Sequence, residues 1–154
     1  MLFHMNQPIA GIKSEVKSLM SPYEGKRGFT IIKLPDFLMD QVLPEQDSLQ
    51  IRKENFRAFR VMIFHQKQSS HYRCEQLQHD MMAYLDSLGF NQILDKPASK
   101  SNMRLYEKNK KENWREQVAI YNSDSTLFMF NYISNLAPQQ VIAFSSQLGY
   151  QDFL

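Results

Sequence analysis

Residues 56–64 constrain the fold more than any other segment, because their pattern places apolar side chains on both faces of one strand. Successive side chains of a strand point to opposite sides of its sheet. One face would carry Phe59, Val61 and Ile63, and the other would carry Met62 and Phe64. Both sides of such a strand must be covered, so we predict that it lies in the interior of a sheet rather than at an edge.

The clearest helical pattern follows this strand. Apolar residues recur there at steps of three and four, the spacing of one helix face: Cys74, Leu77, Met81, Tyr84, Leu85 and Leu88. We expect Ser69 or Ser70 to cap the helix by accepting a hydrogen bond from a backbone N–H group. Gly89 is expected to end it in the left-handed conformation.

The rest of the chain is predicted to hold mostly strands. We expect strands over residues 29–32, 90–94, 103–108, 115–121 and 126–133, a helix over residues 35–43, and a last helix from Pro138 to Gly149 with Val141, Phe144 and Leu148 on its apolar side. The order β-α-β-α-β-β-β-β-α is typical of an α+β fold. It predicts a mostly antiparallel sheet of about five to six strands packed by two to three helices. Residues 24–150 would form this single domain, and residues 1–23 an N-terminal extension or short helix.

The composition agrees with a packed domain and excludes several classes of protein. The 154 residues include 12% aromatic side chains and carry a net charge of +2, whereas disordered chains have few aromatics and a large net charge. The longest apolar run, residues 81–85, is far shorter than the roughly 20 residues that cross a bilayer. A single cysteine excludes an internal disulfide and a Cys-rich zinc site.

Three segments together resemble a known family. They are Gly-Phe-Thr-Ile-Ile-Lys-Leu at residues 28–34, Phe-Arg-Val-Met-Ile-Phe at residues 59–64 with the helix that ends in Leu-Gly-Phe at residues 88–90, and the hairpin over residues 118–133 that turns through Asn-Ser-Asp. In this order they resemble a Bacteroidetes family of small exported or lipoprotein domains of unknown function, over roughly residues 24–146. The resemblance implies a periplasmic or membrane-anchored protein but no activity and no catalytic residues.

The N-terminus departs from that family. Residues 1–7 show no basic region, no apolar region and no cleavage site of a signal peptide, and no cysteine that could be lipidated lies near the start. We therefore expect a periplasmic or membrane-anchored location if a signal was removed, and a cytoplasmic location otherwise.

No local motif for catalysis, metal binding or phosphate binding is present in the sequence. Cys74 lies one helical turn after His71, an arrangement that can activate a thiol, but its place on the apolar stripe predicts a core side chain. His71 and His79 are about 80° out of register on a helix, and no zinc motif accompanies them. We predict no catalytic residue, no cofactor and no metal, and a non-enzymatic protein. An enzyme whose site is assembled from distant loops is a third hypothesis.

Positive charge is concentrated in one predicted hairpin. Residues 96–115 carry a net charge of +5, which leaves −3 for the rest of the chain. The candidate surface residues there are Arg104, Lys108, Lys110, Lys111 and Arg115. One interpretation is a cytoplasmic nucleic-acid-associated domain, with the flanking Tyr106 and Trp114 available for stacking. A second is contact of the hairpin with an anionic membrane surface. A third is a solvated hairpin whose lysines discourage edge pairing.

A row of aromatic side chains on residues 126–133 is the other candidate surface. Phe128, Phe130 and Tyr132 would share one face of this strand. They belong to the core if helices cover that face, and to an interface if the face is left open. Our first hypothesis is a non-enzymatic interaction domain that binds an unknown protein partner or a second copy through its sheet, and nucleic acid is the alternative.

Overall fold

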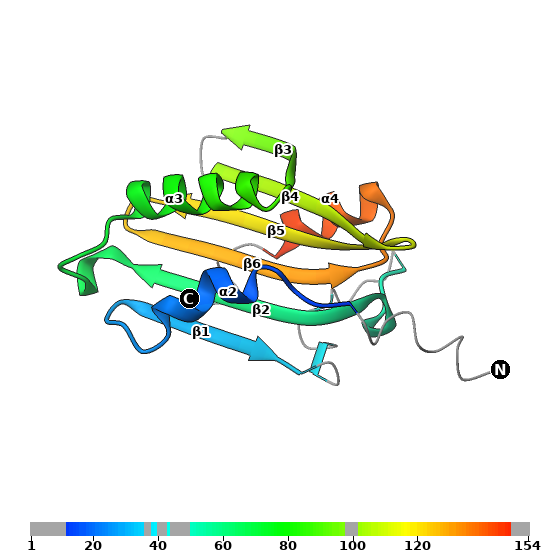
Figure 1. Cartoon of the computed structure of the whole chain (residues 1–154), viewed down its shortest axis with the longest axis horizontal. Helices are drawn as coiled ribbons and strands as arrows, with labels where there is room; N and C mark the ends of the chain where they lie inside the picture. Colours follow the sequence, from blue (N-terminus) through cyan, green and yellow to red (C-terminus); the bar gives the residue numbers. More distant parts are fainter. Residues whose placement is uncertain (1–11, 36–37, 40–42, 44–49, 98–101, 149–154) are drawn as a thin grey trace.

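The computed structural model describes residues 12–35, 38–39, 43, 50–97 and 102–148. These residues form one six-stranded antiparallel sheet with three α-helices (Figure 1), which confirms the predicted α+β fold. The strands are β1 (Phe29–Leu34), β2 (Phe56–His65), β3 (Asn91–Pro97), β4 (Asn102–Lys111), β5 (Trp114–Ser123) and β6 (Thr126–Ser134). The helices are α2 (Lys17–Met20), α3 (Cys74–Ser87) and α4 (Pro138–Gln147), and short 3₁₀ turns are η1 (Ser21–Tyr23), η3 (Lys53–Asn55) and η4 (Gln66–Gln68).

The strand order across the sheet is β1-β2-β6-β5-β4-β3. Strands β3 to β6 follow one another as a meander, and β2 pairs with β6 on one side and with β1 on the other. The interior position predicted for residues 56–64 is therefore confirmed. Strands β1 and β3 form the two edges of the sheet.

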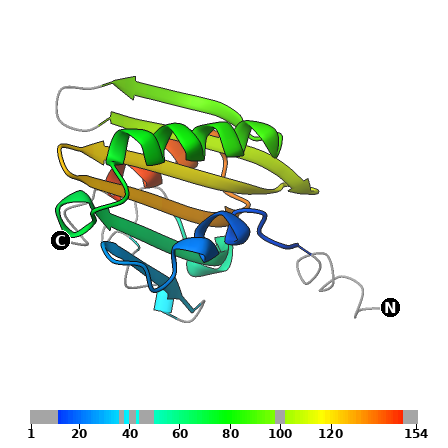
Figure 2. The ribbon, with the colours of Figure 1, turned by 60° about the vertical axis from the view of Figure 1, so that its left-hand side comes forward.

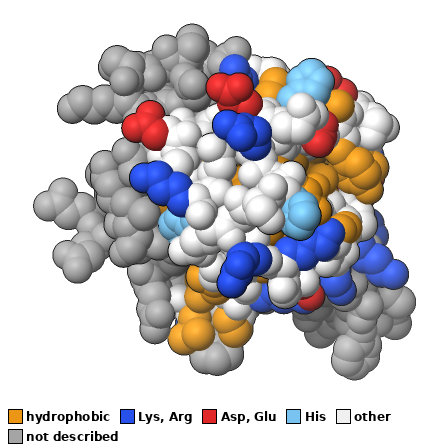
Figure 3. All heavy atoms as spheres, turned by 90° about the vertical axis from the view of Figure 1, so that its left-hand side faces the viewer, with side chains coloured by type: hydrophobic (Ala, Val, Ile, Leu, Met, Phe, Trp, Pro, Cys, Tyr) orange, Lys and Arg blue, Asp and Glu red, His pale blue; other side chains and the backbone are white. Residues whose placement is uncertain are grey.

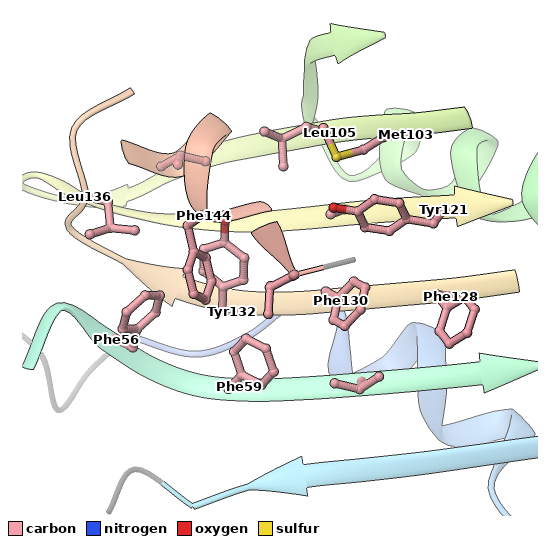
Figure 4. Close-up of a cluster of buried hydrophobic side chains, with 14 of the residues drawn as sticks. Phe56, Phe59, Met103, Leu105, Tyr121, Phe128, Phe130, Tyr132, Leu136 and Phe144 are labelled. Carbon is pink, nitrogen blue, oxygen red and sulfur yellow. The ribbon is translucent and has the colours of Figure 1, made fainter. Parts of the chain in front are cut away.

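One face of the sheet packs against α4. Phe59, Val61 and Ile63 point to this side together with the aromatic row of β6, as predicted from their alternation. Figure 4 shows Phe144 of α4 beside the rings of Phe56, Phe59 and Tyr132, and their ring centroids lie 4.8 to 6.4 Å from that of Phe144. Closely spaced rings of this kind stabilise a core beyond their area burial.

The opposite face packs against α3 and α2, which lie together on that side of the sheet (Figure 2). Met62 and Phe64 meet Leu77 and Met81 there, and Cys74 is 1% exposed in the same cluster. The predicted helical stripe is thus confirmed, apart from Tyr84, which is 37% exposed. Both faces of the sheet are covered by helices, which is why β2 carries apolar residues on both sides.

The N-terminal cap of α3 differs from the prediction. The helix begins at Cys74, and the backbone N–H of Cys74 donates to the side-chain oxygen of Gln66 at 2.8 Å. Ser69 instead accepts from the N–H groups of His71 and Tyr72, at 3.2 Å each, in the turn before the helix. The long Gln66 side chain reaches from η4 to the helix start, so the helix needs no adjacent serine. Gly89 ends α3 with φ +87°, as predicted.

Several predicted boundaries shift. β3 extends to Pro97 and β4 to Lys111, so the turn between β4 and β5 is shorter than predicted and holds Glu112 at φ +56°. Within the N-terminal region, Val16, Leu19 and Met20 are buried against the α3 side of the sheet. The helix predicted over residues 35–43 falls largely outside the described residues, and Gly149 lies wholly outside them. None of the helices in the described ranges is long and apolar enough to cross a membrane.

Candidate interaction surface

Two lysines of the basic hairpin are paired with carboxylates. Lys108 Nζ lies 2.8 Å from a carboxylate oxygen of Glu15, and Lys110 pairs with Glu15 and, at 3.1 Å, with Glu116. Burial acts to raise the pKa of Glu15, but the hydrogen bonds from Lys108 and Lys110 outweigh it and hold the pKa below its usual value. Much of the positive charge predicted for this hairpin is therefore neutralised within the chain.

Glu116 is the centre of this polar cluster, and it is completely buried. Its carboxylate accepts from Ser14 Oγ at 2.6 Å, from the backbone N–H of Glu15 at 2.9 Å and from Asn131 Nδ2 at 2.9 Å, in addition to Lys110. Ser14 and Glu15 belong to residues 12–16, which we call the N-terminal strap. The strap crosses the sheet on the α3 side (Figure 1), and Glu116 fixes it there.

The remaining predicted hairpin residues lie in different surroundings. Arg115 pairs with Glu107 at 3.1 Å, Arg104 is half-buried, and Lys111 is exposed at the turn. The two aromatics considered for base stacking, Tyr106 and Trp114, are 1% and 5% exposed. A base could not stack on either ring without displacing core contacts.

The aromatic row of β6 lies in the core. Phe128, Phe130 and Tyr132 are each 0% exposed, and the Tyr132 hydroxyl is 2.7 Å from Ser145 Oγ of α4. This is the first of the two arrangements considered for these residues, with the face covered by a helix. The three rings do not form a surface in this structure.

The Cys–His pair does not come together as a reactive site. Cys74 is buried and His71 is exposed, and burial raises the pKa of the Cys74 thiol. Within the described ranges no three His, Cys, Asp or Glu side chains are grouped so as to hold a metal ion.

The surface at the end of the sheet formed by η4 and the β5–β6 turn shows Lys and Arg side chains among Asp, Glu and His side chains (Figure 3).

The two edges of the sheet differ. β3 is irregular, with a register shift between Gln92 and Leu94 and a proline at its end. β1 pairs with β2 through six consecutive residues without a shift, and it contains no proline. Bulges, prolines and charged side chains are among the devices that protect edge strands from further pairing. Of the two edges, only β1 lacks a bulge and a proline, and its one charged side chain is Lys33.

The side chains of β1 add to this contrast. Ile32 is 40% exposed and Lys33 is exposed beside it, although both lie within a regular strand. Lys33 is the register partner of Arg60 on β2. Two residues before Arg60, a bulge interrupts the β2–β6 pairing, and Ala58 in that bulge has φ +56°.

The edge strand and the Lys33–Arg60 pair were not among the predicted site residues. A strand over residues 29–32 was predicted, but nothing local marks which strand of a sheet becomes an edge. The cross-strand neighbour of Lys33 is 27 residues away in the sequence and depends on the register.

No protein-family model matches the chain, and no curated protein matches it. Among solved structures, the extracellular domain of PknH from Mycobacterium tuberculosis is similar over 93% of each chain, at 10% sequence identity and a TM-score of 0.31. A similarity of this size carries no argument about function.

Proposed function

We propose that this protein is a non-enzymatic binding domain that pairs an extended segment of a protein partner with the outer edge of β1. The observation that carries the proposal is the regular edge formed by Phe29–Leu34, which has no bulge and no proline and on which Ile32 is 40% exposed. Addition of a strand to an open sheet edge is a common mode of peptide recognition, in which main-chain hydrogen bonds provide affinity.

The backbone of β1 has groups free for this pairing. The N–H of His65 donates to the carbonyl of Gly28 at 2.8 Å, which makes these two residues a hydrogen-bonded pair of the ladder. Hydrogen-bonded and non-hydrogen-bonded pairs alternate along an antiparallel ladder. The N–H and C=O groups of Ile31 and Lys33 therefore point away from β2, and no strand in the described part of the chain pairs with them.

The competing nucleic-acid hypothesis has less support from the contacts. Lys108, Lys110 and Arg115 are each bound to a carboxylate of the same chain. A phosphate would have to displace those carboxylates before it could bind the hairpin.

A peptide of about eight alternating threonine and valine residues, which is ordinary strand length, tests the proposal. We expect the peptide to slow hydrogen exchange of the Ile31 and Lys33 amides, measured by NMR. A control peptide that is N-methylated on the residues facing β1 should give no protection.

The two edges provide a matched pair of variants. Ile32 on β1 and Ile93 on β3 are 40% and 38% exposed, so each can be replaced by asparagine at little cost to folding. Ile32→Asn should weaken peptide binding and Ile93→Asn should leave it unchanged. Equal effects of the two variants, or unprotected Ile31 and Lys33 amides in excess peptide, would refute the proposal.

We also propose a periplasmic or membrane-anchored location, on the basis of the family resemblance of residues 24–146. Fractionation of the producing cells, with an antibody against the chain, checks it. Recovery only in the cytoplasmic fraction would contradict this location and leave the edge-binding proposal unaffected.

A further inference from the structure

We infer that Lys33, supported by Arg60, forms a subsite for an acidic side chain, so that the β1 edge selects extended segments that carry aspartate or glutamate. This inference rests on the proposed function and specifies the partner at the same edge. The chemical class of the ligand is an acidic peptide segment in an extended conformation.

The first support is the placement of two positive charges side by side. Lys33 and Arg60 are directly opposite each other in the β1–β2 register. Because Gly28 and His65 form a hydrogen-bonded pair, the alternation makes Lys33 and Arg60 a non-hydrogen-bonded pair. Side chains approach most closely in such pairs, with Cβ atoms about 4.5–5.5 Å apart, and like charges there repel.

The second support comes from the contacts that the described residues make with this pair. No carboxylate pairs with Lys33 in the described part of the chain. Arg60 donates from Nη1 to Asn131 Oδ1 at 3.4 Å, and its Nε is buried without a hydrogen-bond partner. The charge of Glu116 favours the Arg60 guanidinium, but burial lowers the pKa of Arg60 more strongly.

Glu116 has little capacity left for Arg60. Its two oxygens already accept from Ser14, from the N–H of Glu15, from Asn131 and from Lys110. The Asn131 contact also holds Arg60 over β6, so that Arg60 contributes positive potential behind Lys33 rather than a direct contact at the edge. Lys33 is the exposed residue that meets the ligand.

The geometry of an added strand places a ligand side chain beside Lys33. Every second side chain of a strand paired with β1 would lie on the α3 side of the sheet, the side to which Lys33 points. A glutamate or aspartate at the position facing Lys33 would gain an opposite-charge cross-strand pair. The side chain on the other face of the added strand would lie beside Ile32, which favours an apolar residue.

The same charges select against a second copy of this chain at the edge. A two-fold pairing of β1 with β1 would bring Lys33 and Arg60 of both copies onto one face. The paired sheets would then carry four positive charges on that face, two from each copy. An acidic segment relieves this repulsion, which is why we assign a partner of opposite charge rather than self-association.

Two peptides that differ only in the residue facing Lys33 test the inference. Both alternate threonine and valine, and one carries glutamate where the other carries lysine. We expect the glutamate peptide to bind about tenfold more tightly by fluorescence anisotropy at low salt, and the preference to shrink in about 1 M salt because surface charges are then screened. Lys33→Gln should remove the preference. Lys111→Gln, which removes an exposed lysine at the distant β4–β5 turn, should retain it.

Each other outcome is decisive. If both peptides protect the Ile31 and Lys33 amides and bind equally well, the acidic subsite is wrong and edge binding stands. If neither peptide protects these amides, edge binding is wrong and the subsite falls with it. If sedimentation shows a dimer and the amides are protected without peptide, a second copy occupies the edge and the inference is overturned.

Discussion

Replacing Glu116 by glutamine should destabilise the protein strongly, because this side chain is a buried acceptor for four donors. Ser14 and Asn131 donate to one oxygen, and the N–H of Glu15 and Lys110 Nζ bind the other. Glutamine has nearly the same shape but presents an NH₂ group in place of one oxygen. The new NH₂ group would then face the two donors that had bound the replaced oxygen, and Lys110 would lose its buried carboxylate partner.

The size of the effect follows from these contacts. A hydrogen bond to a charged group contributes about 1.5–3 kcal/mol, and removal of one member of a buried ion pair costs about 3–5 kcal/mol. We therefore expect Glu116→Gln to lower the free energy of unfolding by about 3–5 kcal/mol. The melting temperature should fall by about 10 °C for a chain of this size.

Urea denaturation followed by tryptophan fluorescence measures the free energy of unfolding, since Trp114 lies two residues from Glu116. Hydrogen exchange of the Glu15 amide, which donates to Glu116, reports on the N-terminal strap directly. Glu107→Gln is the matched control, because Glu107 accepts from Arg115 and Gln117 but its side chain is 15% exposed. We expect a loss of only about 1 kcal/mol for this more exposed pair. Equal losses in the two variants would refute the central role of Glu116.

Three further predictions concern single residues. The pKa of Glu15 is lowered in the folded state, so its contribution to stability is present above the ordinary value of 4.5 and is lost as the pH falls through the folded value. The free energy of unfolding, measured in urea at a series of acidic pH values, should therefore depend less on pH in Glu15→Gln than in the unmodified chain. The same pH dependence in both proteins would contradict this. Ala58→Gly should raise the free energy of unfolding by about 1 kcal/mol in urea, because Ala58 has φ +56°, where a side chain is strained; a decrease would show that the bulge is not strained. Cys74 is 1% exposed, so an aromatic disulfide reagent should react with it only after unfolding, and rapid labelling of the folded protein would contradict its buried position.

Alternation and helical spacing were sufficient to predict much of the fold. The two faces of β2, the buried stripe of α3 and the glycine that ends it could be recognised because each depends on residues that are close in the sequence. The Gln66 cap could not be recognised in this way, since it depends on the turn that carries Gln66 back to Cys74.

The charged contacts could not be predicted from the sequence for the same reason. The basic hairpin is visible as a run of lysines, but Glu15, which binds Lys108, lies 93 residues earlier in the chain. The sequence alone shows neither that partner nor the register that sets Lys33 beside Arg60. Local patterns therefore overstated the exposed charge of the hairpin and missed the positive pair at the β1 edge.

The strap also has a consequence for the order in which the chain is assembled. Residues 12–16 are synthesised before the sheet, yet Ser14 binds Glu116 and Asn131, which follow it by 102 and 117 residues. On the ribosome the strap must therefore wait until most of the chain has emerged before it can dock. The meander of β3 to β6 pairs only strands that are neighbours in the sequence, so it can form first. It then provides the surface to which the strap binds. The strap is thus made before the strands that bind it, and Val16, Leu19 and Met20 cannot be buried against the sheet until those strands have formed.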